Sequence, residues 1–165
     1  NQHRSYWTTR KMTALFVLVL LVAYSLYSYP STKKDALDYA KNEDQFINDL
    51  VLWLTENFPK ETVVAIADVG AIAYISEMKI IDYEGLNDPL LSRGWNSTYF
   101  WSKNPDIIIL SSKSDQQLLV FTKNMLSIYS DTSFQNYTLV RKNQFSSSFY
   151  HWIYLKNSQI PKKSG

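Results

Sequence analysis

The chain has 165 residues, of which 45% are hydrophobic and 19% are charged, and this composition predicts one folded domain. It contains no cysteine, which excludes a disulfide scaffold, a cysteine-ligated zinc site and a thiol nucleophile. It contains only two histidines, which excludes a histidine-rich metal centre. Residues 35–165 hold 12 basic and 15 acidic residues, a net charge of −3, whereas every charged residue before Asp35 is basic. This mildly acidic body argues against a nucleic-acid partner, which needs a basic face.

The first predicted element is a transmembrane helix over residues 13–29, which follows a basic cytoplasmic lead-in over residues 1–12. The run 14–29 carries no charge and is dominated by Leu, Val and aromatic residues. It lies at the short end of the roughly 17–25 residues that a helix needs to cross a bilayer. Basic residues are slightly more numerous before the run than after it, which places the N-terminus in the cytoplasm and the body outside.

A secretory signal peptide and a buried core helix are the alternatives for this run. Bulky tyrosines, among them Tyr27 and Tyr29, stand where a signal peptide has small residues at its cleavage site. A core helix of a soluble protein shows a polar face, which this run lacks. We therefore favour a helix that spans the membrane.

A polar tether is predicted over residues 30–42, followed by a domain over residues 43–160. Apolar residues recur at three- and four-residue spacing from Phe46 to Phe58, which predicts an amphipathic helix. Pro59 ends this helix, because its ring and its missing N–H cannot continue the hydrogen-bond ladder.

Short apolar runs after Pro59 predict the strands of a sheet. Three of them are typical of buried central strands: Thr62–Ala67, Lys79–Tyr83 and Asp106–Leu110. Residues 115–129 are predicted to form a second helix, and Tyr137–Arg141 and Phe149–Leu155 to form an antiparallel hairpin. Strands that alternate with helices predict an α/β fold, namely a small α/β sandwich with a mostly parallel core and an antiparallel edge hairpin.

Three of the four glycines, Gly70, Gly85 and Gly94, fall within one 25-residue span. Glycine serves positions of positive φ or close backbone approach, so we expect unusual backbone geometry in this span. Asp68 and Gly70 follow the first predicted strand, and Asp82 and Gly85 end the second one. In open α/β sheets, ligands bind at this edge.

The same span carries the pattern D-x-G-x-x-x-Y-x-S, then I-D-x-x-G-L-x-D-P and a P-D-I-I-I-L strand. It resembles the C-terminal extracytoplasmic domain of polytopic bacterial glycosyltransferases of the GT-C class, including arabinofuranosyltransferase-like and mannosyltransferase-like members. The resemblance covers residues 44–112. The matching positions are Asp68, Gly70, Tyr74, Ser76, Asp82, Gly85, Leu86, Asp88 and Pro105-Asp106.

The resemblance implies that the parent enzyme transfers sugars from polyprenyl-phosphate donors outside the bacterial cytoplasmic membrane. It also implies that the catalytic carboxylate lies in an extracytoplasmic loop near the start of the membrane region. This region is outside the present sequence, so no catalytic residue is carried over and the fragment alone is expected to be inactive. The implied partners are the lipid bilayer, the remaining transmembrane helices of a longer chain, and a lipid-linked sugar or a glycan acceptor. No cofactor is implied.

The residues after the predicted strands supply the candidate ligand-binding residues. They are Asp68, Gly70, Tyr74, Asp82, Gly85, Asp88, Trp95 and Trp101. One hypothesis is that the three aspartates converge on sugar hydroxyls or on a divalent cation, which carboxylates suit. In the alternative, Asp68 caps a helix, Asp82 pairs with neighbouring backbone and Asp88 forms an Asx-turn before Pro89.

Aromatic residues gather in the predicted loop at positions 95–101, which is otherwise rich in Asn and Ser. They are Trp95, Tyr99, Phe100 and Trp101. Such rings stack on sugars, enter the lipid interface, pack onto transmembrane helices, or cover the core of their own domain. The sequence leaves these alternatives open.

Two other functions stay under consideration. The first is a single-pass, membrane-anchored binding or scaffolding module without enzymatic activity. The second is a small hydrolase, which requires His151 to approach an acid and a serine. The chain has no G-x-S-x-G motif and His151 has no obvious acidic partner in the sequence, so we expect a structural histidine.

Overall fold

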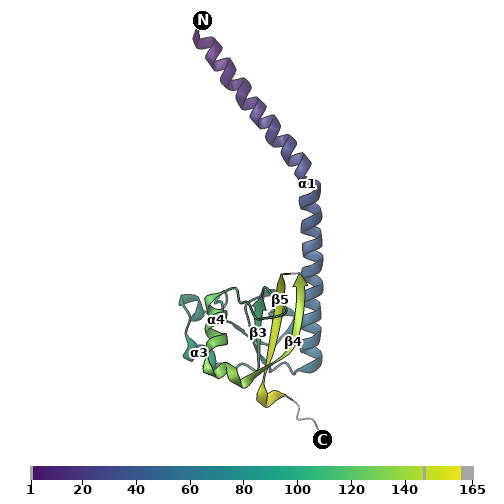
Figure 1. The fold of residues 1–165 in the computed structure, drawn as a ribbon, viewed down its shortest axis with the longest axis vertical. Coiled ribbons are helices and arrows are strands. Elements are labelled where there is room, and N and C mark those ends of the chain that lie inside the picture. The colour runs from purple at the N-terminus through teal and green to yellow at the C-terminus, as the bar shows by residue number, and fades with distance from the viewer. Residues whose placement is uncertain (1, 147, 161–165) are drawn as a thin grey trace. The chain divides into compact units, whose positions relative to one another are not determined.

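The computed structural model describes residues 2–146 and 148–160 (Figure 1). The helices and strands occur in a mixed order along the chain. They are α1 (Gln2–Asn57), β1 (Val63–Ile66), α2 (Gly70–Ser76), β2 (Lys79–Asp82), α3 (Ser97–Ser102), β3 (Ile107–Ser112), α4 (Lys123–Ser130), β4 (Tyr137–Ser146) and β5 (Phe149–Lys156). Three short 3₁₀ helices accompany them, namely η1 (Leu91–Arg93), η2 (Thr132–Asn136) and η3 (Asn157–Gln159).

Helix α1 contains a stretch, Lys11–Pro30, that is long and apolar enough to cross a membrane. None of the residues in this stretch is buried, which distinguishes it from the core helix of a soluble protein. A signal sequence near an N-terminus has the same length and composition. The contacts within the chain define two units, which meet in the sequence between Lys41 and Asn42.

The predicted tether over residues 30–42 is helical and forms part of α1. No glycine or proline lies between Pro30 and Pro59, so no residue in this interval breaks the ladder. Pro30 itself is accommodated inside the helix. The helix thus begins well before Phe46 and includes the predicted tether, because a polar composition without a helix breaker does not end a helix.

The second unit contains a five-stranded mixed sheet with the strand order β2-β1-β3-β5-β4. Strand β1 pairs in parallel with β2 and with β3, whereas β5 pairs in antiparallel fashion with β3 and with β4. The predicted fold class is thereby confirmed: three parallel strands form one half of the sheet, and the β4–β5 hairpin closes its other edge.

Apolar side chains cover both faces of this sheet. On one face, Leu50 and Leu54 of α1 and Ile72 of α2 lie in one cluster with Ile107 and Ile109 of the sheet. On the other face, a second cluster combines α3 and α4 with the alternate residues of β3. Burial on both faces explains why β3 is buried along its whole length and begins with a continuous apolar run, Ile107–Leu110.

Two predicted boundaries differ from the structure. The helix predicted over residues 115–129 begins only at Lys123, because the Thr122 hydroxyl accepts a hydrogen bond from the N–H of Met125 and caps the first turn. The loop predicted at residues 95–101 contains α3, whose N-terminus is capped by the Asn96 side chain at 2.9 Å from the N–H of Tyr99.

Candidate functional site

The carboxyl ends of the three parallel strands place polar residues at one edge of the sheet. Asp68 lies two residues beyond β1, Asp82 is the last residue of β2, and Ser111 and Ser112 are the last residues of β3. Since parallel strands present their carboxyl ends together, the sequence prediction of a polar edge agrees with the geometry.

Asp68 is bound to a histidine from the far end of the chain. Its Oδ2 atom lies 2.9 Å from Nε2 of His151, and the Ser111 hydroxyl donates to the same oxygen at 3.5 Å. The His151 side chain is fully buried, whereas that of Asp68 is 55% exposed. The expected helix cap was wrong, because α2 is preceded by Val69 and has no side-chain cap.

His151 belongs to a polar row that crosses three strands. It pairs with Ser111 on β3 and with Asn143 on β4, so the three side chains share one face of the sheet. The Phe46 ring of α1 covers the imidazole at a centroid distance of 4.6 Å, and Phe149 lies at 5.5 Å. Within the described residues, Nδ1 of His151 and Nδ2 of Asn143 are buried without a hydrogen-bond partner.

An acid and a serine, the groups that a hydrolase requires, lie near His151, although the sequence showed no obvious acidic partner for it. The spatial arrangement of the three residues does not suit hydrolysis, however, because Asp68 lies between Ser111 and His151 and contacts both. In a serine nucleophile system, the histidine lies between the serine and the acid and accepts the hydroxyl proton. Here the serine donates to the acid itself, so the arrangement orients a carboxylate and does not activate the hydroxyl.

Asp82 and Gly85 shape the turn after β2. The Asp82 carboxylate accepts hydrogen bonds from the N–H groups of Glu84, Gly85 and Asn87 at 3.1, 3.0 and 2.6 Å. Gly85 has φ +82°, and a Cβ atom there would lie 2.5 Å from the nitrogen of Ser92. The structural alternative for Asp82 is therefore the one observed.

Asp88 forms the expected Asx-turn. Its Oδ1 atom accepts from the N–H groups of Leu90 and Leu91 at 2.9 and 3.1 Å, and Oδ2 accepts from the Tyr99 hydroxyl at 3.0 Å. Partial desolvation raises the pKa of Asp88, but the hydrogen bonds from Leu91, Leu90 and Tyr99 outweigh it and hold the pKa below its usual value. Among the described residues, no group of three His, Asp or Glu side chains lies together as a metal site.

The remaining predicted residues lie in two different settings. Gly70 opens α2 with free space around its Cα, so it does not need the close approach expected of it, and Tyr74 on the same helix is 87% exposed. Trp95 and Trp101 are partly buried against the core and flank the fully buried Phe100 at centroid distances of 5.1 and 4.8 Å. These aromatic residues thus cover the core of their own domain.

Glu84 is a functional candidate that the sequence reasoning missed. Burial raises the pKa of its carboxyl group, although Thr122 and Asn124 donate hydrogen bonds to it at 2.5 and 3.3 Å. Nearby Asp82 also raises the pKa. The sequence signal that could have identified Glu84 is its position between Asp82 and Gly85, since both of these residues were predicted to lie at the binding edge of the sheet.

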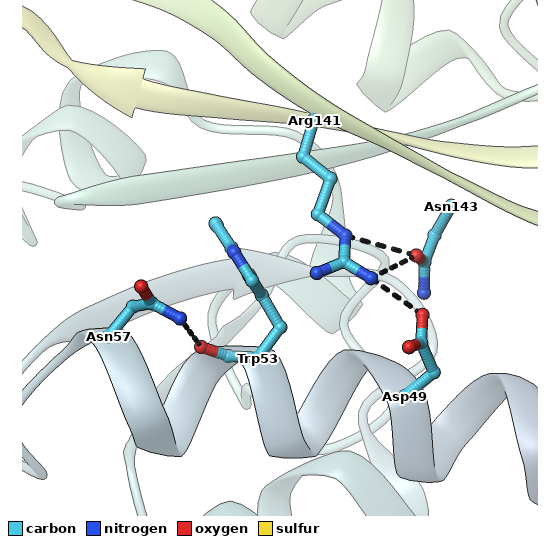
Figure 2. Close-up of polar contacts among 5 residues, drawn as sticks. All are labelled: Asp49, Trp53, Asn57, Arg141 and Asn143. Atoms are coloured by element: carbon cyan, nitrogen blue, oxygen red, sulfur yellow. Dashed lines mark hydrogen bonds and ion pairs between the residues drawn. The ribbon is translucent and has the colours of Figure 1, made fainter.

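A second missed group joins α1 to β4 (Figure 2). The Arg141 guanidinium donates to Asp49 Oδ2 at 2.6 Å and to Asn143 Oδ1 at 3.2 and 3.0 Å, and its carbon lies 5.3 Å from the Trp53 ring centroid. A register shift in β4 between Leu139 and Arg141 turns Arg141 towards α1. No signal in the sequence reveals such a shift.

Comparison with known proteins places part of the chain in a family. Residues 36–158 match the family model described as Domain of unknown function (DUF8728). No curated protein and no solved structure matches the chain. The matched residues begin after the apolar stretch Lys11–Pro30 and cover the sheet with all of its strands. The chain therefore belongs to the DUF8728 family.

Proposed function

We propose that this chain is the C-terminal part of a bacterial membrane glycosyltransferase that uses polyprenyl-phosphate-linked sugars. Its α/β domain lies on the extracytoplasmic side and helps to bind the acceptor or the donor at the carboxyl edge of β1 and β2. In this proposal, the catalytic carboxylate belongs to another part of the enzyme, and the fragment alone is inactive.

The observation that carries the proposal is the oriented carboxylate of Asp68. A fully buried histidine holds Oδ2 of a side chain that is 55% exposed. Both hydrogen bonds described above go to Oδ2, which leaves Oδ1 for a ligand. A carboxylate held in one orientation accepts hydrogen bonds from sugar hydroxyls at little cost in conformational entropy.

Two further features support the proposal. The stretch Lys11–Pro30 is suited to anchor the domain at a membrane, where lipid-linked sugars reside. The ring of Tyr74 on α2 is 87% exposed and offers an aromatic face to solvent.

The test is sugar transfer by the full-length gene product in membrane vesicles supplied with polyprenyl-phosphate donors. Asp68→Asn retains an oxygen that accepts from His151 but removes the charge, so transfer should fall about tenfold through the loss of one charge-assisted hydrogen bond. Asp44→Asn, at an exposed position of α1, is the matched control and should transfer like the wild type.

The outcomes separate the proposal from its alternative. Loss of transfer in Asp68→Asn with unchanged thermal unfolding supports binding at this edge. Equal transfer by both variants removes the edge from the substrate site. If the wild-type gene product transfers no sugar from any donor, the chain is better described as an anchored binding or scaffolding module.

A further inference from the structure

A cavity separate from the Asp68 edge lies between α1 and β4. Its volume is about 220 Å³, far above the roughly 10–15 Å³ that accommodates one water molecule. The lining residues come from both elements. They are Asn42, Gln45, Phe46, Asp49, Asn143, Gln144 and Phe145.

A buried amide donor without a partner lines this cavity. Asn143 is 5% exposed, and its Nδ2 atom has no hydrogen-bond partner within the described residues. Its orientation is fixed by chemistry, because Arg141 can only donate and therefore selects Oδ1 as the atom that faces it. In Figure 2 the amide oxygen of Asn143 faces Arg141 and the amide nitrogen points away from it. An unsatisfied buried donor costs about 1–3 kcal/mol, which a bound acceptor would recover.

The chemistry of the lining favours a neutral ligand rich in hydroxyl groups. Three amide side chains, those of Asn42, Gln45 and Asn143, can each donate and accept. The Asp49 carboxylate adds a further acceptor. The rings of Phe46 and Phe145 form the apolar part of the lining and pack edge to face at a centroid distance of 5.4 Å. No lysine or arginine is among the lining residues, so the cavity does not favour an anion such as phosphate.

We infer that the cavity between α1 and β4 binds a single sugar unit, with Asn143 Nδ2 donating to one of its hydroxyl oxygens. This inference does not depend on the proposed function, because sugar binding here can be measured whether or not the gene product transfers sugar. It concerns a different part of the domain, since Asp68 does not line the cavity.

The experiment is a titration of the ¹⁵N-labelled full chain in lipid nanodiscs with D-mannose, D-arabinose and D-galactose, followed by the side-chain amide resonances. Inorganic phosphate is the comparison probe. At least one sugar should shift the Asn143 amide resonances in a saturable way, and phosphate should not. Gln45→Ala, at an exposed position, should raise the dissociation constant about 2- to 10-fold.

Asn48→Ala is the matched control, because Asn48 lies on the same exposed part of α1 but does not line the cavity. It should bind the sugar like the wild type. The inference is overturned if no sugar shifts the Asn143 resonances, if phosphate shifts them instead, or if Gln45→Ala and Asn48→Ala bind equally well. Because Gln45 is exposed, Gln45→Ala should fold like the wild type, and this keeps the test decisive.

Discussion

His151 Nε2 and Asp68 Oδ2 lie 2.9 Å apart, although the residues are 83 positions apart in the sequence. The histidine pairs with Ser111 on β3 and with Asn143 on β4, and Phe46 of α1 covers its ring. The pair thus connects the C-terminal hairpin to the loop after β1. The histidine of this pair is fully buried and the aspartate is 55% exposed, so the proposed binding group faces solvent while its partner belongs to the core.

Removal of the acid should destabilise the domain. Asp68→Ala leaves the buried Nε2–H of His151 without its partner, and this should lower the free energy of unfolding by about 1–3 kcal/mol. Asp44→Ala, at an exposed position, should change it by less than about 0.5 kcal/mol. Urea unfolding followed by tryptophan fluorescence measures both variants. Equal stability of the two would mean that the His151 contact contributes nothing in solution.

The glycine after β2 should be irreplaceable. Gly85→Ala forces a side chain to adopt φ +82° and brings Cβ within 2.5 Å of the Ser92 nitrogen, so it should cost at least about 1–3 kcal/mol. Gly70→Ala is the matched control: it lies in open space at the start of α2 and should be neutral or slightly stabilising. Thermal unfolding of the two variants provides the comparison, and a similar melting temperature for both would contradict the turn geometry.

The Asp131 carboxylate should make stability depend on pH under acidic conditions. The N–H of Ser133 donates to it at 2.9 Å and the Ser97 hydroxyl at 2.8 Å, and these hydrogen bonds lower the pKa of Asp131 to about 2. A lowered folded-state pKa stabilises the fold above the unfolded value of 3.8, and this contribution disappears as the pH falls towards 2.

The comparison variant for this prediction is Asp131→Asn, which keeps a capping oxygen but cannot ionise. The stability difference between wild type and variant should be constant above pH 4 and should shrink between about pH 4 and pH 2. Urea midpoints across this range measure it. A difference that grows on acidification would show that the carboxylate is not stabilised in the folded domain.

Charges within Lys11–Pro30 should prevent membrane insertion. Leu18→Arg combined with Leu21→Arg adds about 2.5–3.5 kcal/mol per residue to the cost of insertion. The double variant should then appear in the soluble fraction after alkaline carbonate extraction. Leu37→Arg, which lies outside the stretch, is the control and should stay in the membrane fraction. Retention of the double variant would argue that this stretch does not span the bilayer.

The sheet could be predicted from the sequence because its signals are local. The segments Val63–Ile66 and Ile107–Leu110 are apolar and rich in β-branched residues, and both lie in buried parallel strands. The hairpin followed from two strand-like segments around a serine-rich turn. Each of these features depends on neighbouring residues alone, so burial on both faces can be inferred before any contact is known.

The candidate sites could be predicted only in part, because they depend on contacts between distant segments. Asp68 was identified by its place after a strand, but its partner His151 becomes visible only when β5 lies beside β3. Arg141 faces Asp49 because a register shift after Leu139 reverses the alternation of β4, and the pattern of the sequence does not encode that shift.

The sequence of the gene upstream of the codon for Asn1 tests the glycosyltransferase proposal most directly. The proposal predicts a reading frame that continues through many apolar helices, with acidic residues in the first outer loop. A start codon within a few residues of Asn1 would contradict it, and the domain would then be an anchored module without an attached enzyme.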